Sequence, residues 1–227
     1  MAWVNLKAAI EVNAVDCLYL PFHTEDTTLQ TAAVEVLYTL LGRPYGQHWH
    51  ESWLTLLRQA LWPDRISLLR RTFERVQISP GEDDEKYTLQ KKLTEVLSVL
   101  ADAIAQHPEL LTSDIDLPAF FDLLLQALQS NSLVVSIPVL HSWTKLIAVR
   151  DTTIESLALQ ALGTLVQTCS TRLLRYESIT SERDISDNEI VLFLSEDFDT
   201  TPERHAFLGN YRRYCVSIIQ ADRKSVV

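Results

Sequence analysis

Residues 86–107 read KYTLQKKLTEVLSVLADAIAQH, and this stretch decides the fold class. Its apolar side chains recur at steps of three and four residues, at Leu89, Leu93, Val96, Leu100 and Ile104. Steps of this size place side chains on one face of an α-helix, so the stretch predicts a long amphipathic helix. The following His107-Pro108 pair ends it, because proline has no backbone N–H to continue the helix.

The same periodicity recurs along the chain and predicts an all-α fold. Helices are expected over residues 2–9, 11–20, 27–42, 48–61, 64–78, 86–107, 115–129, 132–148, 152–175 and 202–222. Pro138 either kinks the helix at 132–148 or marks its start after Ser136. Residues 189–194, EIVLFL, are the best candidate for a strand, and a loop packed onto helices is the favoured interpretation there.

Helices in pairs joined by short turns predict stacked helical hairpins, because one hairpin cannot bury its own apolar face. The chain has no fixed ankyrin or tetratricopeptide signature. Divergent repeats of about 40–47 residues, the HEAT length, fit the expected helices best. We therefore expect an α-α superhelix, a HEAT/ARM-like solenoid of antiparallel hairpins, with residues 1–227 as one solenoid segment.

The composition favours a folded helical chain and a basic protein partner. Only five of 227 residues are glycine, 47% are hydrophobic and the formal net charge is −10. Such an acidic chain is repelled by phosphate, so RNA is expected to bind only through a longer parent protein. No apolar run reaches the roughly 18–20 residues of a membrane span, so no membrane partner is expected. Three scattered cysteines predict buried, reduced thiols in an intracellular protein: Cys17, Cys169 and Cys215.

Two acidic segments interrupt the helices, near residues 81–85 and 177–201. Loops of this kind are either functional or disordered, and a solvated disordered insert is the favoured interpretation of 177–201. Arg212 and Arg213 either meet phosphate or an acidic partner, or, as the favoured interpretation, pair with the acidic stretch or a neighbouring repeat. The candidate partner contacts are Glu82, Asp83, Asp84, Glu196, Asp197, Asp199, Arg212 and Arg213.

Catalytic and metal-binding motifs are weak. In the run QHWHE at 47–51, His48 and His50 lie about 200° apart on a helix and cannot share a small ion. The chain has no phosphate-binding glycine loop, no nucleophile elbow and no Cys-x-x-Cys pair. Nothing in the sequence places His141 beside Cys169. We therefore expect no catalytic residue, no metal, no cofactor and no enzymatic activity.

Residues 197–214, DFDTTPERHAFLGNYRRY, resemble the middle of exportin-five-type karyopherins of the importin-β superfamily. Residues 140–147, LHSWTKLI, resemble a helix with a central tryptophan in the same proteins, and segments 86–107, 115–148, 152–176 and 197–219 follow the family's order. These exportins are long HEAT superhelices that bind the GTP form of the small GTPase Ran together with cargo, and they contact Phe-Gly nucleoporins in the pore.

The resemblance implies a nuclear transport receptor that shuttles between nucleus and cytoplasm, with a structured small RNA or a phosphoprotein as cargo. Full karyopherins are several times longer than this chain, so a central fragment or a truncated gene product is expected. The alternative is a generic helical-repeat scaffold that has no binding activity of its own.

Overall fold

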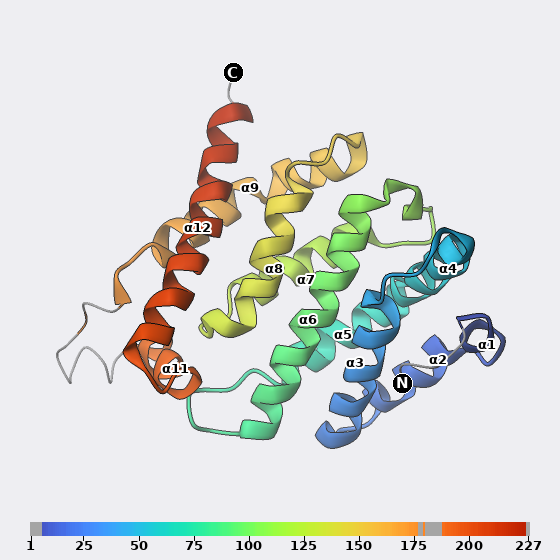
Figure 1. Ribbon diagram of the computed structural model, residues 1–227, viewed down its shortest axis with the longest axis horizontal. Helices are drawn as coiled ribbons and strands as arrows, with labels where there is room; N and C mark the ends of the chain where they lie inside the picture. The colour runs from blue at the N-terminus through green and yellow to red at the C-terminus, as the bar shows by residue number, and fades with distance from the viewer. Residues whose placement is uncertain (1–5, 177–178, 180–187, 226–227) are drawn as a thin grey trace. The chain divides into compact units, whose positions relative to one another are not determined.

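The computed structural model describes residues 6–176, 179 and 188–225, and every regular element among them is a helix (Figure 1). The expected all-α helical-repeat class is thereby confirmed. The chain divides into two compact units: unit 1 comprises Met1–Gln77 and Asp83–Leu123, and unit 2 comprises Ile78–Glu82 and Leu124–Val227. How the two units continue into one solenoid stays a prediction.

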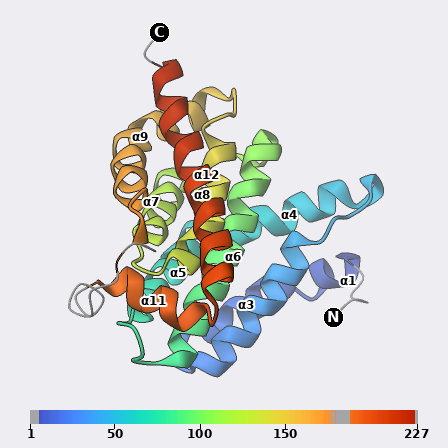
Figure 2. The ribbon, with the colours of Figure 1, turned by 60° about the vertical axis from the view of Figure 1, so that its left-hand side comes forward.

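Unit 1 is centred on the packing of α3 against α6. These two helices make the most extensive contact in the unit and run side by side in both views (Figures 1 and 2). At the end of α3, a Cβ added to Gly42 would lie 3.3 Å from Val99 Cγ2 of α6, so the small residue permits a close approach. The elements of unit 1 are α1 (Leu6–Glu11), α2 (Ala14–Tyr19), η1 (Leu20–His23), α3 (Thr27–Gly42), η2 (Gln47–Trp49), α4 (His50–Ala60), α5 (Pro63–Arg75), α6 (Asp84–Gln106) and η3 (Pro108–Leu110).

Unit 2 is organised around its last helix. The helix α12 packs against both α9 and α8, and α11 packs against α8. A hydrogen bond of 2.9 Å joins the hydroxyls of Ser136 on α8 and Tyr211 on α12, both buried. The elements are α8 (Leu133–Leu146), α9 (Thr152–Arg172), α11 (Glu189–Asp197) and α12 (Thr201–Ser225), while α7 (Leu117–Leu128) is divided between the units.

The three thiols differ in burial. Cys169 of α9 and Cys215 of α12 are buried in unit 2, whereas Cys17 of α2 is exposed, so the expectation of a buried thiol is wrong for Cys17. All three are free cysteines. The neighbouring Cys169 thiol and burial raise the pKa of Cys215, and Cys215 is therefore neutral.

The apolar stripe of residues 86–107 is confirmed, since all five of its predicted members are buried in α6. The predicted range 27–42 coincides with α3. Near the N-terminus the chain turns at Asn13, which has a φ of 49°, so the helix expected over 11–20 begins only at Ala14 and becomes 3₁₀ at Leu20. Asparagine tolerates this left-handed conformation better than most residues.

Two expectations in unit 2 need correction. Residues 189–194 lie in the helix α11, so the strand and loop interpretations are both wrong, and 177–201 is not one continuous loop. The helix α8 does not start after Ser136: it begins at Leu133, with Ser132 as its N-cap and Pro138 inside it. The Ser132 hydroxyl accepts the amide of Val135 at 3.2 Å, which fixes this start.

None of the helices in the described ranges combines the length and the apolar character needed to cross a lipid bilayer.

The N-cap of α9 provides a first prediction. One carboxylate oxygen of Asp151 accepts the amides of Thr153 at 2.9 Å and Ile154 at 3.1 Å. Asp151→Ala leaves both amides at the helix start without this acceptor, and we expect it to lower the free energy of unfolding by about 1 kcal/mol. Urea unfolding followed by circular dichroism measures the loss. Asp151→Asn keeps an acceptor and should retain most of the stability, and equal losses in the two variants would contradict the capping role.

Candidate functional site

The candidate site in unit 2 is an acidic surface where two segments distant in sequence meet. The loop Ile78–Glu82 turns at Gly81, whose φ of 73° is strained for any residue with a side chain. A Cβ added to Gly81 would lie 3.5 Å from Glu196 Oε1, in the last turn of α11. Glu82 and Glu196 are both exposed. We call the exposed carboxylates Glu82, Glu196 and Asp199 the acidic surface.

The helix α11 is held in place by its cap and its apolar face. The side chain of Asn188 accepts the amides of Ile190 at 3.1 Å and Val191 at 3.3 Å. Val191, Phe193 and Leu194 are buried, and the helix packs against α8. This leaves Glu196 and the half-buried Asp197 at the C-terminal end of the helix, where the backbone dipole disfavours negative charge. Helix stability therefore does not explain their position.

The turn between α11 and α12 is also defined by side chains. The ring of Phe198 contacts that of Phe207, with centroids 4.8 Å apart, and Asp199 is exposed between the two helices. Thr200 Oγ1 lies 3.4 Å from the amide of Glu203, which it caps, and donates to the Glu203 carboxylate at 2.7 Å. The helix α12, which begins at Thr201, is thus capped by the preceding Thr200.

The two candidate arginines have different surroundings. Arg212 is half-buried and donates to the carbonyl of Leu174, just beyond the end of α9, at 3.2 Å. Arg213 is exposed, donates to Asn210 Oδ1 at 2.7 Å and lies over the ring of Tyr214. Arg212 therefore connects neighbouring helices, and Arg213 is the more accessible of the pair. The acidic residues Glu177, Glu182, Asp184 and Asp187, which were candidates for pairing with them, lie outside the described residues.

The remaining two candidates belong to unit 1, at the start of α6. Asp83 accepts the amide of Lys86 at 3.0 Å and pairs with the Lys86 ammonium at 3.2 Å. That backbone hydrogen bond holds the pKa of Asp83 below its ordinary value. Asp84 is exposed in the first turn, where negative charge suits the helix dipole. The observed contacts thus account for Asp83 as a helix cap.

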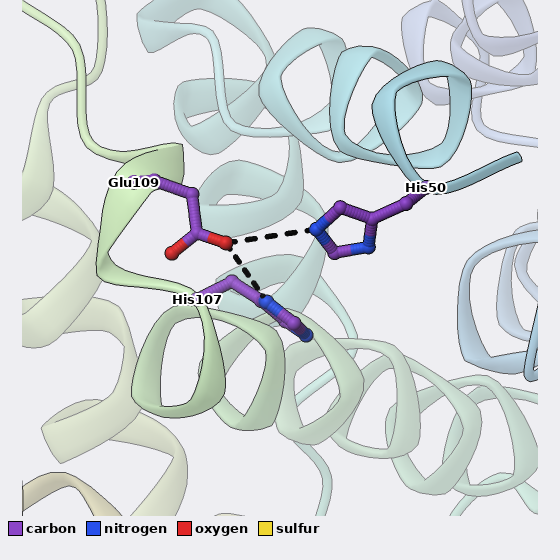
Figure 3. A group of neighbouring side chains, drawn as sticks. All are labelled: His50, His107 and Glu109. Atoms are coloured by element: carbon purple, nitrogen blue, oxygen red, sulfur yellow. Dashed lines mark hydrogen bonds and ion pairs between the residues drawn. The ribbon is translucent and has the colours of Figure 1, made fainter. Parts of the chain in front are cut away.

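A group that sequence reasoning missed lies in unit 1, where His50, His107 and Glu109 point toward one another (Figure 3). Glu109 Oε1 is 3.1 Å from His107 Nδ1 and 3.6 Å from His50 Nε2. A hydrogen bond from the backbone amide of Glu109, aided by His107 and His50, holds the pKa of this carboxyl below its ordinary value. The carboxylate is therefore ionised at neutral pH.

Two cavities lined by described residues differ in character. One in unit 1, of about 370 Å³, is lined mainly by apolar groups of α1, α2, α3 and the turn between α1 and α2, among them Val12, Val36 and Leu40. Another, in unit 2, has about 320 Å³, and its walls carry both apolar and polar groups, Arg172 among them. Arg172 is buried and donates to the carbonyls of Gln129 and Ser130 at 3.3 and 2.8 Å. These bonds connect the end of α9 to the α7–α8 turn.

Comparison with known proteins identifies the family. The family model for Exportin-5 matches residues 84–221, which run from α6 into α12 and make up more than half of the chain. The uncharacterized protein C328.01c of Schizosaccharomyces pombe is 25% identical over 97% of the chain, and the chain spans only 18% of the length of that relative. The chain therefore belongs to the Exportin-5 family.

Proposed function

We propose that the chain acts as a segment of a nuclear transport receptor and that its acidic surface binds the GTP form of Ran. Membership of the Exportin-5 family and the all-α helical-repeat fold support the transport role. The choice of surface rests on the approach of the Ile78–Glu82 loop to the end of α11. Gly81, the neighbour of the exposed Glu82, lies against Glu196, a carboxylate whose position helix stability does not explain.

Charge decides which class of partner this surface can take. With a formal net charge of −10, the chain repels phosphate backbones and attracts basic protein surfaces. Complementary charges accelerate association and favour the correct partner over others. Export cargo and Phe-Gly nucleoporins are further partners in this proposal, RNA binds only through a longer parent protein, and the receptor shuttles between nucleus and cytoplasm.

A charge-reversal pair tests the surface. Glu82→Lys combined with Glu196→Lys places positive charge opposite a basic partner, and we expect roughly tenfold weaker binding to Ran-GTP, because a tenfold change corresponds to about 1.4 kcal/mol. Biolayer interferometry with Ran loaded with GTP or GDP measures the affinities. Raising the salt from about 50 to 300 mM should weaken binding by the unmodified chain and have less effect on the variant.

The matched control reverses the same number of charges elsewhere. Glu25 and Glu35 are exposed in unit 1, so Glu25→Lys with Glu35→Lys changes the net charge equally and should leave Ran-GTP binding within about twofold. Circular dichroism verifies that both variants are folded. Equal binding to the two nucleotide forms, or equal weakening by the two charge-reversal pairs, would refute the proposal and favour a helical scaffold without binding activity.

A further inference from the structure

We propose that His50, His107 and Glu109 form a binding site for a divalent transition metal ion, with zinc as the ion that fits best. One ligand atom from each residue lies within 4.8 Å of the other two (Figure 3). Two imidazoles and a carboxylate are ligands that zinc accepts in proteins, whereas magnesium and calcium favour sets made of oxygen alone.

The distances fit a tetrahedral ion. Zinc binds imidazole nitrogen and carboxylate oxygen at about 2.0–2.2 Å, which separates neighbouring ligand atoms by about 3.4 Å. The observed separations from Glu109 Oε1 are 3.1 Å to His107 Nδ1 and 3.6 Å to His50 Nε2. The imidazole rings are 4.9 Å apart between centroids. These two separations lie within a few tenths of an ångström of the tetrahedral value, and the third, between the imidazole nitrogens, is at most 4.8 Å, so a small rotation of the His50 or His107 side chain would complete the three-ligand set.

The fold brings the ligands together from two corners of unit 1. His50 begins α4 directly after the short helix η2. His107 is the C-cap residue of α6, and Glu109 follows it in η3, a turn imposed by Pro108. Arg58 of α4 donates to the carbonyl of Glu109 at 3.1 Å, and this bond holds the backbone of η3 against α4.

Trp53 supports both imidazoles. Its indole N–H donates to the carbonyl of Leu41 at 2.8 Å, which fixes the ring. The indole then contacts the His107 ring edge-on, with centroids 5.2 Å apart, and lies 6.0 Å from the His50 ring. Partners that hold ligand side chains in place commonly change metal affinity by 10–100-fold. Trp53 also places a natural fluorophore next to the proposed ion.

Three protein ligands leave one position of a tetrahedral zinc ion for water or for a ligand from another molecule. Half of the Glu109 side chain is exposed, at 53%, so the ion would be reachable from solvent. The bound metal would connect the η2–α4 corner to the α6–η3 corner. Without an ion, Glu109 makes a hydrogen bond with His107 and lies within ion-pair distance of His50, and the experiment distinguishes these two states.

The test is metal titration of the full chain in a Cys17→Ser background, which removes an exposed thiol that would compete for zinc. We expect isothermal titration calorimetry to give one zinc ion per chain and a Kd on the order of micromolar. Added cobalt(II) should quench the fluorescence of Trp53 and give tetrahedral absorption bands. His50→Ala and Glu109→Gln should each weaken binding at least tenfold, because each removes one of three ligands.

His48→Ala is the matched control. His48 is exposed two residues before His50, its ring contacts that of Trp49 edge-on, and it is not a member of the cluster. This variant should bind zinc with unchanged affinity. Absence of stoichiometric binding, or equal affinity in the His48→Ala, His50→Ala and Glu109→Gln chains, would overturn the proposal. Both readouts are independent of Ran, so the outcome is separate from that of the proposed function.

Discussion

Replacing Trp143 with alanine is expected to lower the free energy of unfolding of unit 2 by about 3–5 kcal/mol. Trp143 lies on α8, its exposed fraction is 0%, and it is among the largest fully buried side chains of the described residues. Truncation removes the transfer free energy of a large aromatic group and leaves a cavity that the helices packed on α8 fill only in part.

Chemical denaturation followed by far-UV circular dichroism measures this loss. Leu159→Ala is the control, because Leu159 is a large apolar residue of α9 with 51% of its surface exposed. That truncation should change stability by no more than about 0.5 kcal/mol. If Trp143→Ala cost no more than Leu159→Ala, the described packing of α8 would be wrong.

Replacing Arg65 with alanine is expected to destabilise unit 1 by about 2–4 kcal/mol. The Arg65 side chain is buried on α5, donates to Asp16 Oδ1 and donates to the carbonyl of Gln59 at 2.6 Å. Its guanidinium lies 4.6 Å from the centroid of the Trp62 ring and 5.4 Å from that of Tyr19. Asp16 is half exposed, so the stacking and the carbonyl contact contribute more than the ion pair.

Two further variants separate charge from shape. Arg65→Lys keeps the positive charge but not the planar fork that stacks on aromatic rings, so it should retain only part of the stability. Arg71→Ala removes an exposed arginine from the same helix and should be nearly neutral. Thermal unfolding of the three variants gives the order of their stabilities. A loss in Arg71→Ala as large as that in Arg65→Ala would indicate that α5 responds to charge or helix propensity alone.

The sequence predicted elements well where one strong apolar stripe faces the core. The stripe on α6 is buried as expected. Its leucines and valine recur at helical spacing, and this pattern predicts the buried face of a helix without a competing interpretation. On α9, large apolar residues alone do not mark the buried face. Leu159 is exposed, and the buried face carries small residues, including Ala158 and Ala161. Small side chains let α12 pack closely, which a search for large apolar residues does not reveal.

Local propensity also misled the interpretation of residues 189–194. Ile190 and Val191 are β-branched and favour strands, but packing of α11 against α8 and the cap at Asn188 make the segment helical. Tertiary contacts therefore determine that this segment is helical, and a window of six residues contains no information on those contacts.

The residues of the acidic surface could be predicted from the sequence, whereas the proposed metal site could not. The acidic candidates were found as charged segments, yet only the structure brings the loop at Gly81 to Glu196. The cluster of His50, His107 and Glu109 could not be predicted, because local spacing addresses only His48 and His50 and carries no information on His107 and Glu109. Their proximity depends on how α4 meets the end of α6, which is a property of the packed fold.

The burial of Cys169 and Cys215 gives the molecule a built-in reporter of opening. A thiol-reactive reagent reaches Cys17 in the native state, while the sulfurs between α9 and α12 become accessible only when these helices separate. The rate at which the two protected sulfurs are modified therefore reports the opening of unit 2 under native conditions, with no introduced label.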